Sequence, residues 1–309
     1  MPTPLTYLII SRYFIHNMKI LITGAAGQVG SELLIQGKLC GHELYGYGSK
    51  ELDITDLAQV TVTAEKIQPD IIINAAAYTA VDKAETEQAL AYAVNATGSE
   101  NLARVCQSHD IPLLHISTDY VYDGEKPTAY IETDTPRANS VYGASKLAGD
   151  EQIIAIWKKH IIIRVSWVFG LQGNNFVKTM LRLAQQRDEL SIVDDQFGAP
   201  TSAQSIARCL LNIIASKQFN QPNCPWGLYN FQSDPGVSWF QFAQEIFQQA
   251  QELGILDKEI KLNPIPSSEF PTPVKRPANS KLDGTKLQQN FAITAAHWKA
   301  DLKEMLGHL

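Results

Sequence analysis

The stretch "KILITGAAGQVGSELL", residues 19–34, decides the fold of this chain. Its β-forming apolar residues end in three glycines, Gly24, Gly27 and Gly30, after which the apolar residues take helical spacing. Glycine allows a tight turn with positive φ and lets a phosphate approach the backbone closely. A helix that begins near Gln28 would add unpaired N–H groups and the positive end of its dipole. The stretch therefore predicts a strand, a phosphate-binding loop and a helix, in the order that dinucleotide binding requires.

The same alternation of strand and helix patterns continues along the chain. Short apolar runs predict buried parallel strands, and longer amphipathic stretches predict the helices between them. The predicted strands cover 19–23, 42–48 (the weakest), 71–74, 112–117, 161–166 and 227–231, and the predicted helices cover 28–39, 55–67, 84–108, 142–158, 174–186 and 202–216. Repeated units of this length predict an α/β fold, a doubly wound parallel sheet (Rossmann) with right-handed crossovers.

The pattern loosens beyond about residue 170, which predicts a second, smaller part. Five prolines between residues 263 and 280 predict loop or extended chain there. We expect a dinucleotide-binding domain over 18–169 plus 200–235, and a C-terminal substrate lobe over 170–199 plus 236–309. Open α/β sheets bind ligands at the carboxyl ends of their strands, so the lobe is expected there. Residues 1–17 precede the first strand, and we interpret them as a dispensable or mis-assigned extension.

Composition excludes several classes of function. The net charge is −6 and the pI is about 5.7, with no run of Lys or Arg, so nucleic acid is not an expected partner. No apolar stretch approaches the roughly 20 residues of a membrane span. The four cysteines are far apart and the seven histidines are scattered. Free thiols in a reducing compartment, the cytoplasm, are therefore expected, and a histidine-based metal site is not.

A tyrosine and a lysine four residues apart indicate the chemistry. Reduction of a ketone needs a proton donor, and a lysine one helical turn away can lower the pKa of a tyrosine and hold a cofactor ribose. Tyr142 and Lys146 have this spacing in "VYGASKLAGDEQII", a predicted helix. Tyr122 and Lys126 share the spacing in the turn-rich "YDGEK", where helical facing is not expected. We therefore predict Tyr142 as the proton donor.

Two further polar residues lie near this predicted pair. Thr118 follows the strand 112–117, and its hydroxyl can bond the same carbonyl oxygen, although a turn or capping role is the alternative. Asn95 lies inside a predicted helix, where asparagine is a poor helix former. It is expected either to hold a water or backbone group near the lysine, or to make an ordinary structural contact.

The end of the second predicted strand bears on cofactor preference. An acidic residue at that position would repel a 2′-phosphate, but "GYGSK" stands there, and Ser49 and Lys50 could tolerate one. NADPH is therefore the expected cofactor, with NADH as the alternative. Asp53 is expected at the adenine end. The small residues Ala75 to Ala77, which follow the third strand, would let the cofactor lie close.

Six motifs together resemble one family. "GAAGQVGSEL", "NAAAYTAVDKAE", "STDYVYDG", "YGASKLAGDE", "DDQFGAPT" and "KRPANSKLD" are similar, in order, to the signatures of the dTDP-4-dehydrorhamnose reductase family of extended short-chain dehydrogenases. The resemblance runs from Met18 to about residue 285. It implies reduction of the C4 ketone of dTDP-4-dehydro-L-rhamnose to dTDP-L-rhamnose by an NAD(P)H-dependent enzyme, and a homodimer is a further expectation.

The resemblance also implies roles for individual residues. The catalytic trio would be Thr118, Tyr142 and Lys146. The cofactor would be bound by Gly24, Gly27, Gln28, Val29, Gly30, Asp53, Ile54, Ala76, Ala77 and Thr79, together with Tyr142 and Lys146. The dTDP-sugar would be bound by Thr118, Asp119, Tyr120, Trp167 and Arg276, the last as a partner of the diphosphate.

Some members of this family form dimers linked by Mg²⁺ through glutamates. Glu32 matches one such position, but the other ligands find no match in this sequence. We therefore interpret Glu32 as a helix-surface residue and predict no metal site, with Mg²⁺ as the alternative.

Other activities of related chains fit less well. A dehydratase would need a glutamate after the aspartate, but Asp119 is followed by Tyr120. A 4-epimerase would usually have small residues in place of "STDY". The alternatives that stay open are another nucleotide-sugar short-chain dehydrogenase, and a non-catalytic NADP-binding subunit that resembles the regulatory β subunit of methionine adenosyltransferase.

Overall fold

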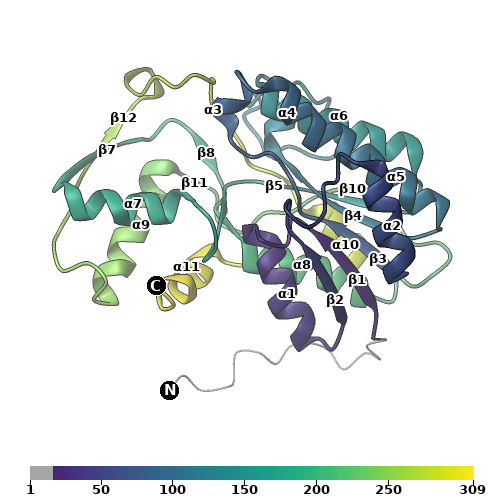
Figure 1. Cartoon of the computed structure of the whole chain (residues 1–309). Helices are drawn as coiled ribbons and strands as arrows, with labels where there is room; N and C mark the ends of the chain where they lie inside the picture. The colour runs from purple at the N-terminus through teal and green to yellow at the C-terminus, as the bar shows by residue number, and fades with distance from the viewer. Residues whose placement is uncertain (1–16) are drawn as a thin grey trace.

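A six-stranded parallel sheet forms the larger part of the molecule (Figure 1). The structure, a computed structural model, describes residues 17–309. The strands of this sheet are β1 (Lys19–Thr23), β2 (Glu43–Tyr47), β3 (Ile71–Asn74), β4 (Leu113–Thr118), β5 (His160–Val165) and β10 (Gly227–Asn230). Their order is β10-β5-β4-β3-β1-β2, and every neighbouring pair is parallel. The doubly wound parallel sheet is thus confirmed.

The strand order places the ligand-binding edge of the sheet. From β1 the chain first adds β2 on one side and then β3 on the other, so the winding reverses at β1. Ligands of open α/β sheets bind at such a reversal, beyond the carboxyl ends of the strands. The predicted phosphate loop and Thr118 both lie at this edge, because they follow β1 and end β4.

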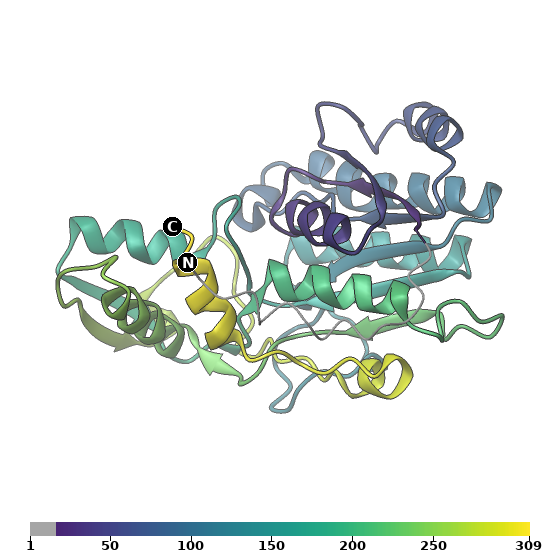
Figure 2. The same cartoon turned by 90° about the horizontal axis from the view of Figure 1, so that it is seen from below.

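Helices cover both faces of the sheet (Figures 1 and 2). One face packs against α1 (Gln28–Leu39), α8 (Ala203–Ala215) and α10 (Thr285–Phe291). The other packs against α2 (Leu57–Ile67), α5 (Gly98–Ser108) and α6 (Val141–Ile156). Every residue of β3 and β5 is buried, which explains why most residues of these strands are isoleucine or valine.

The predicted helix over 84–108 is interrupted. The structure has α3 (Val81–Ala84), then α4 (Gln88–Tyr92), a π-helical turn (Ala93–Thr97) and α5. Within the π turn, the side-chain amide of Asn95 makes two hydrogen bonds with the backbone of Tyr78. It accepts from the N–H and donates to the carbonyl oxygen. A π turn accommodates one extra residue in the helix, often at functional sites. Asn95 thus holds a backbone segment, and it also donates a 3.0 Å bond to Ser145, the neighbour of Lys146 in the sequence.

The second lobe has its own apolar core (Figure 1). It contains α7 (Phe176–Gln186), α9 (Trp239–Glu252) and α11 (Trp298–Leu306), beside the parallel pair β7 (Glu189–Val193) and β12 (Lys261–Ile265). The sequence reading did not predict β7, and β12 carries Pro264 within the stretch predicted as loop or extended chain. Proline is tolerated in β12 because both strands of this two-stranded sheet are edge strands, so one side of β12 has no strand to bond.

Short elements join the two parts. The strands β6 (Val168–Phe169) and β9 (Thr201–Ser202) pair in parallel, and β8 (Phe197–Gly198) pairs with β11 (Val237–Ser238) in antiparallel. The chain also forms single 3₁₀ turns at Asp119–Val121 and Ser267–Glu269. These short pairs connect the carboxyl ends of the main strands to the lobe.

One boundary of the predicted domains differs in the structure. Helix α10 falls inside the predicted substrate lobe, but Leu287 and Phe291 are buried in the core of the main sheet. Its ring contact with Tyr229 of β10 explains the placement. The predicted extension over 1–17 lies outside the described residues except for Asn17. Within the described part of the chain, no helix has the length and apolar character needed to span a membrane.

Candidate active site

The glycine loop packs so closely against neighbouring backbone that side chains would not fit at two of its glycines. Gly24 has φ +68°, and a Cβ there would lie 2.5 Å from the backbone of Ala75. A Cβ on Gly30 would lie 2.2 Å from the carbonyl oxygen of Gly24, so glycine lets α1 approach β1. Gly27 caps α1 without a side-chain hydrogen bond. The exposed N-terminus of α1, with its positive dipole end, fits the phosphates of a dinucleotide.

The remaining residues predicted to bind the cofactor lie around this loop in different settings. Gln28 accepts a 3.0 Å hydrogen bond from Asn175, the N-cap of α7, and so connects the loop to the second lobe. Val29 is buried beneath the loop, whereas Ala76 and Ala77 are half-buried and Thr79 is exposed. Their contact with a cofactor stays a prediction.

The predicted adenine end of the site is held by a residue that sequence reading missed. Asn101 of α5 donates hydrogen bonds to the carbonyl oxygens of Ile54 and Thr55. The side chain of Ile54 is buried in the core. Asp53 is exposed and accepts hydrogen bonds from Thr55.

An acidic side chain does reach the end of β2. The carboxylate of Glu51 accepts a 2.9 Å hydrogen bond from the N–H of Gly48, the residue that follows this strand. The expectation that no acid ends the second strand is therefore incomplete, because it considered only the strand itself and "GYGSK". Ser49 and Lys50 are exposed beside this carboxylate.

Thr118 and Tyr142 meet at the carboxyl end of β4. Thr118 ends that strand, and its hydroxyl caps the following turn by accepting from the N–H of Tyr120. Tyr142 lies in the first turn of α6, which is capped by Ser140. Gly143 lets this turn pack closely, since a Cβ there would lie 2.1 Å from the carbonyl oxygen of Tyr120. The hydroxyl of Thr118 donates a 3.1 Å hydrogen bond to the carboxylate of Asp119. It also lies close enough to the phenol of Tyr142 to act on the pKa of that group.

Lys146 lies one turn further along α6 and points into the protein. It is 1% exposed, and its Nζ donates to the carbonyl oxygen of Ile116 at 2.8 Å. Burial lowers the pKa of Lys146 to about 8, and the carboxylate of Asp150 opposes this shift.

The expected lowering of the Tyr142 pKa by Lys146 is not seen. Burial raises the pKa of Tyr142, and the nearby hydroxyl of Thr118 opposes the rise only in part. The reason is that the amine of Lys146 is bonded to β4, so desolvation of the phenol dominates. The phenol therefore stays protonated.

Several of the residues predicted to bind the substrate lie near the phenol of Tyr142. The ring of Tyr120 makes an edge contact with the ring of Tyr142, with centroids 5.5 Å apart. Arg276, from the second lobe, lies close enough to Tyr120 to oppose the rise that burial causes in the pKa of its phenol, and it forms a 2.6 Å ion pair with Asp82. Asp119 is 4% exposed, and burial raises its pKa to about 6. Sequence reading had not singled out Asp82, although it lies in the quoted motif "TAVDKAE".

Trp167 lies at the border of the second lobe. It follows β5 with φ +46°, a backbone conformation that is strained for a large residue. Its indole stacks on that of Trp239 at 3.5 Å between centroids. A Cβ on Gly198 would lie 2.3 Å from the same indole, so a small residue is required there. The partners Trp239 and Gly198 are distant in sequence, and no local pattern predicted them.

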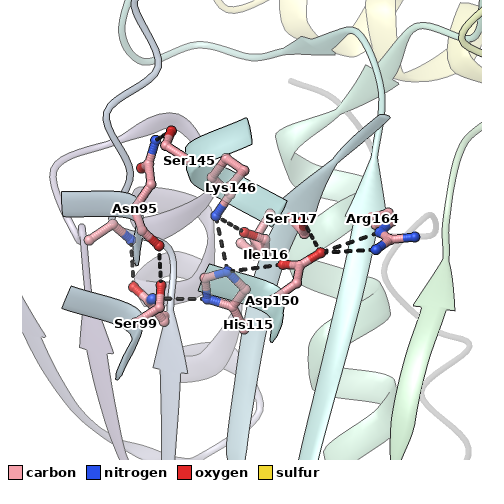
Figure 3. Close-up of polar contacts among 11 residues, drawn as sticks. Asn95, Ser99, His115, Ile116, Ser117, Ser145, Lys146, Asp150 and Arg164 are labelled. Atoms are coloured by element: carbon pink, nitrogen blue, oxygen red, sulfur yellow. Dashed lines mark hydrogen bonds and ion pairs between the residues drawn. The ribbon is translucent and has the colours of Figure 1, made fainter. Parts of the chain in front are cut away.

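A buried polar cluster lies directly behind Lys146 (Figure 3). His115 of β4 lies 3.0 Å from the amine, and Asp150 of α6 lies beyond it. Asp150 accepts hydrogen bonds from Ser117 and Arg164. Sequence reading did not single out these residues, because they are spread over β4, α6 and β5.

The metal alternative receives no support from the geometry. Glu32 is half-buried on α1 and accepts a 3.2 Å hydrogen bond from Gln36. Among the described residues, no three or more His, Cys, Asp or Glu side chains gather to hold an ion. All four cysteines are free, as predicted, and Cys40 is half-buried while the other three are buried.

Comparison with known proteins agrees with this geometry. The family model described as "RmlD substrate binding domain" matches residues 18–309. A curated dTDP-4-dehydrorhamnose reductase of Aggregatibacter actinomycetemcomitans is 44% identical over 293 residues, 94% of this chain and 99% of the relative. That of Escherichia coli strain K12 is 41% identical over 296 residues, 94% of this chain and 98% of the relative.

A solved structure extends the match to three dimensions. The dTDP-4-dehydrorhamnose reductase of Bacillus anthracis, in complex with NADP, superposes with a TM-score of 0.87 at 35% identity. The match covers 95% of this chain and all of the other. The glycine loop, the residues at the end of β4 and the pair on α6 thus occur in a chain that belongs to the dTDP-4-dehydrorhamnose reductase family.

Proposed function

We propose that this protein reduces the C4 ketone of dTDP-4-dehydro-L-rhamnose to dTDP-L-rhamnose, with NADPH as the preferred cofactor. One observation carries the proposal: the protonated phenol of Tyr142 lies beside the hydroxyl of Thr118 at the ligand-binding edge of the sheet, in a chain of this family. The cofactor preference is supported by the NADP in the related Bacillus anthracis structure. NADH is the second cofactor.

The residues of the chain divide the chemistry between them. A bound nicotinamide cofactor, with its phosphates held by the glycine loop, would supply the hydride. Tyr142 donates the proton to the oxygen of the ketone, and Thr118 orients that oxygen through a second hydrogen bond. The raised pKa of Tyr142 keeps the donor protonated before transfer. Lys146 stabilises the anion that remains on the phenol after its proton has left.

The substrate is held by groups from both parts of the molecule. Arg276 binds the diphosphate, since a guanidinium pairs well with phosphate oxygens. Its present ion pair with Asp82 then opens or is shared. Tyr120, which lies beside Tyr142 and Arg276, and Trp167, at the border of the second lobe, are the proposed contacts of the sugar nucleotide. The four free thiols support the expected reducing compartment, the cytoplasm.

The direct test is turnover with the purified protein. NADPH oxidation is followed by absorbance with the keto-sugar nucleotide as substrate, and the product is identified by mass and by its sugar stereochemistry. We expect turnover with dTDP-4-dehydro-L-rhamnose. Turnover with only a different keto-sugar would establish another nucleotide-sugar dehydrogenase. No turnover, with tight binding to a methionine adenosyltransferase, would favour the regulatory subunit instead.

A further inference from the structure

His115 connects the central sheet to Lys146. It lies in β4, three residues before Thr118, and is 0% exposed. Its Nδ1 is 2.9 Å from the side-chain nitrogen of Asn74. Its Nε2 is 3.0 Å from the amine of Lys146 (Figure 3). Both ring nitrogens are therefore used, one toward β3 and one toward α6.

The contacts of Asn74 determine where the proton of His115 lies. The side-chain oxygen of Asn74 accepts from the hydroxyl of Thr23 at 2.7 Å and from the backbone N–H of Ala76 at 3.1 Å. A backbone N–H can only donate, so this oxygen faces Ala76 and the NH₂ group of Asn74 faces His115. That NH₂ group also only donates. Nδ1 of His115 must therefore accept, and a neutral ring carries its proton on Nε2.

The environment keeps this ring neutral. Burial lowers the pKa of His115 well below its ordinary value, and the charge of Lys146 acts in the same direction. The Nε2–H of a neutral ring faces the amine of Lys146 at 3.0 Å. An ammonium group has no lone pair, so a charged Lys146 would place donor against donor, whereas a neutral amine would accept the hydrogen bond.

A second acceptor for the same N–H lies close by. Oδ1 of Asp150 is 3.7 Å from Nε2 of His115. This oxygen is buried and has no hydrogen-bond partner among the described residues. A small rotation of the ring would bring Nε2–H to this oxygen, which removes the conflict when Lys146 is charged.

The buried charges around the ring are unbalanced. Arg164 and Asp150, with side chains 3% and 1% exposed, form an ion pair at 3.3 Å. The carboxylate of Asp150 thus compensates Arg164, which does not lose its proton. Lys146 is a second buried cation beside a single anion, and it is the cation that can titrate. The other ionisable groups around Arg164, Asp150 and His115 include Tyr122, whose hydroxyl accepts from Arg164, together with His160 from β5 and Tyr142 from α6.

We propose that His115 is a positioning residue for Lys146, and that it passes its Nε2–H hydrogen bond between the neutral amine of Lys146 and the free carboxylate oxygen of Asp150. The ring thereby holds the amine beside β4 in both protonation states and allows Lys146 to titrate near neutral pH. The protonation pattern is a property of the chain itself. Its effect on turnover rests on the proposed function.

The first experiment observes the ring in the intact protein without substrate. ¹⁵N-histidine NMR is recorded between about pH 6 and 9, and His115 is assigned by the signal lost in His115→Gln. We expect Nδ1 to be unprotonated and Nε2 protonated throughout, with a shift of the Nε2 signal as Lys146 titrates near pH 8. Lys146→Met should abolish that shift. A protonated Nδ1, or a shift that survives Lys146→Met, would overturn the proposal.

The second experiment reverses the proton of the ring with a nearly isosteric change. In Asn74→Asp, a carboxylate oxygen faces Nδ1 and draws the proton to it, so that Nε2 accepts from a charged Lys146. The NMR pattern should invert. In the unmodified protein, titration of Lys146 should give a step near pH 8 in the pH profile of kcat. In Asn74→Asp this step should move upward by about one pH unit or more, because the charged amine is stabilised.

The variant His160→Gln is the matched control for disturbance of a buried histidine. His160 is 7% exposed in β5, and its Nδ1 is bonded to the carbonyl oxygen of Trp157. This change should leave the pH at which kcat changes unaltered. Inverted NMR signals without turnover would refute the proposed function alone. Normal turnover with an unmoved profile in Asn74→Asp would refute the role of His115.

Discussion

The cofactor side and the substrate side of the site are built in different ways. The cofactor side is a backbone cradle made within residues 19–34, and its shape depends on side chains that are missing at Gly24 and Gly30. The substrate side is assembled from Thr118, Tyr142, Trp167 and Arg276, which lie far apart in the sequence and are brought together by the sheet and the second lobe. The first kind of site is local, and the second depends on the whole fold.

The difference predicts how each side fails when it is changed. Added atoms should damage the cradle, because it has no free volume. Removed atoms should damage the substrate side, because its chemistry depends on the groups present. The variants below test this contrast, from the largest expected effect to the smallest.

Removal of one oxygen from the substrate side should have the largest effect. Tyr142→Phe keeps the ring and its contact with Tyr120 but removes the proton donor. We expect kcat to fall at least about 10²-fold, with an unchanged dissociation constant for NADPH, measured by steady-state kinetics and fluorescence titration.

The second tyrosine with the same spacing provides the control. Tyr122→Phe also removes one phenolic oxygen, which here accepts from Arg164 and donates to Ile131. This variant should lose about 1 kcal/mol of unfolding free energy and keep its kcat. Full turnover in Tyr142→Phe would move the proton donor elsewhere.

The sequence predicted the cradle well because its determinants are close together. A strand, three glycines and a helix occupy 16 consecutive positions, and each has a local physical cause. Tyr142 and Lys146 both lie on α6, as predicted, because their spacing is that of one helical turn. The position of Thr118 could be predicted because it follows a clear apolar run that is typical of a buried strand.

The contacts behind these residues could not be predicted in this way. The pairs Asp82–Arg276 and Trp167–Trp239 join segments that no periodicity relates. The predicted direction of the shift in the Tyr142 pKa was wrong, because burial is a property of the folded molecule and not of the helix pattern. Likewise, His115 and Asp150 appear as ordinary strand and helix residues until the sheet places them behind Lys146.

One added methyl group should disrupt the cradle. In Gly30→Ala, the new Cβ would lie 2.2 Å from the carbonyl oxygen of Gly24, so α1 must move away from β1. We expect a loss of about 1–3 kcal/mol in unfolding free energy and a loss of NADPH binding, measured by denaturation and titration. Gly41→Ala is the matched control, because Gly41 has φ +82° but open space around its Cβ. Its strain should lower stability by about 1 kcal/mol and leave NADPH affinity intact.

Truncation at the lobe border should weaken substrate binding selectively. Trp167→Ala removes the indole that stacks on Trp239. We expect KM for the sugar nucleotide to rise about tenfold, by more than kcat falls, in steady-state assays. Trp226→Ala is the control. This indole lies just before β10, at the amino end of that strand and so away from the carboxyl ends where ligands bind, and it contacts Phe219. An unchanged KM in Trp167→Ala would remove this residue from the substrate site.

The smallest expected effect lies where the cradle does depend on a side chain. The carboxylate of Glu51 is bonded to Gly48 at the end of β2, where a 2′-phosphate would be repelled by its charge. Glu51→Gln keeps the shape and removes the charge, so the ratio of kcat/KM for NADPH over NADH should rise about threefold to tenfold. Lys50→Gln should lower the same ratio, because it removes an exposed cation beside Glu51. A ratio that neither substitution moves would mean that the cofactor side selects its ligand by backbone alone, which would make its contrast with the substrate side complete.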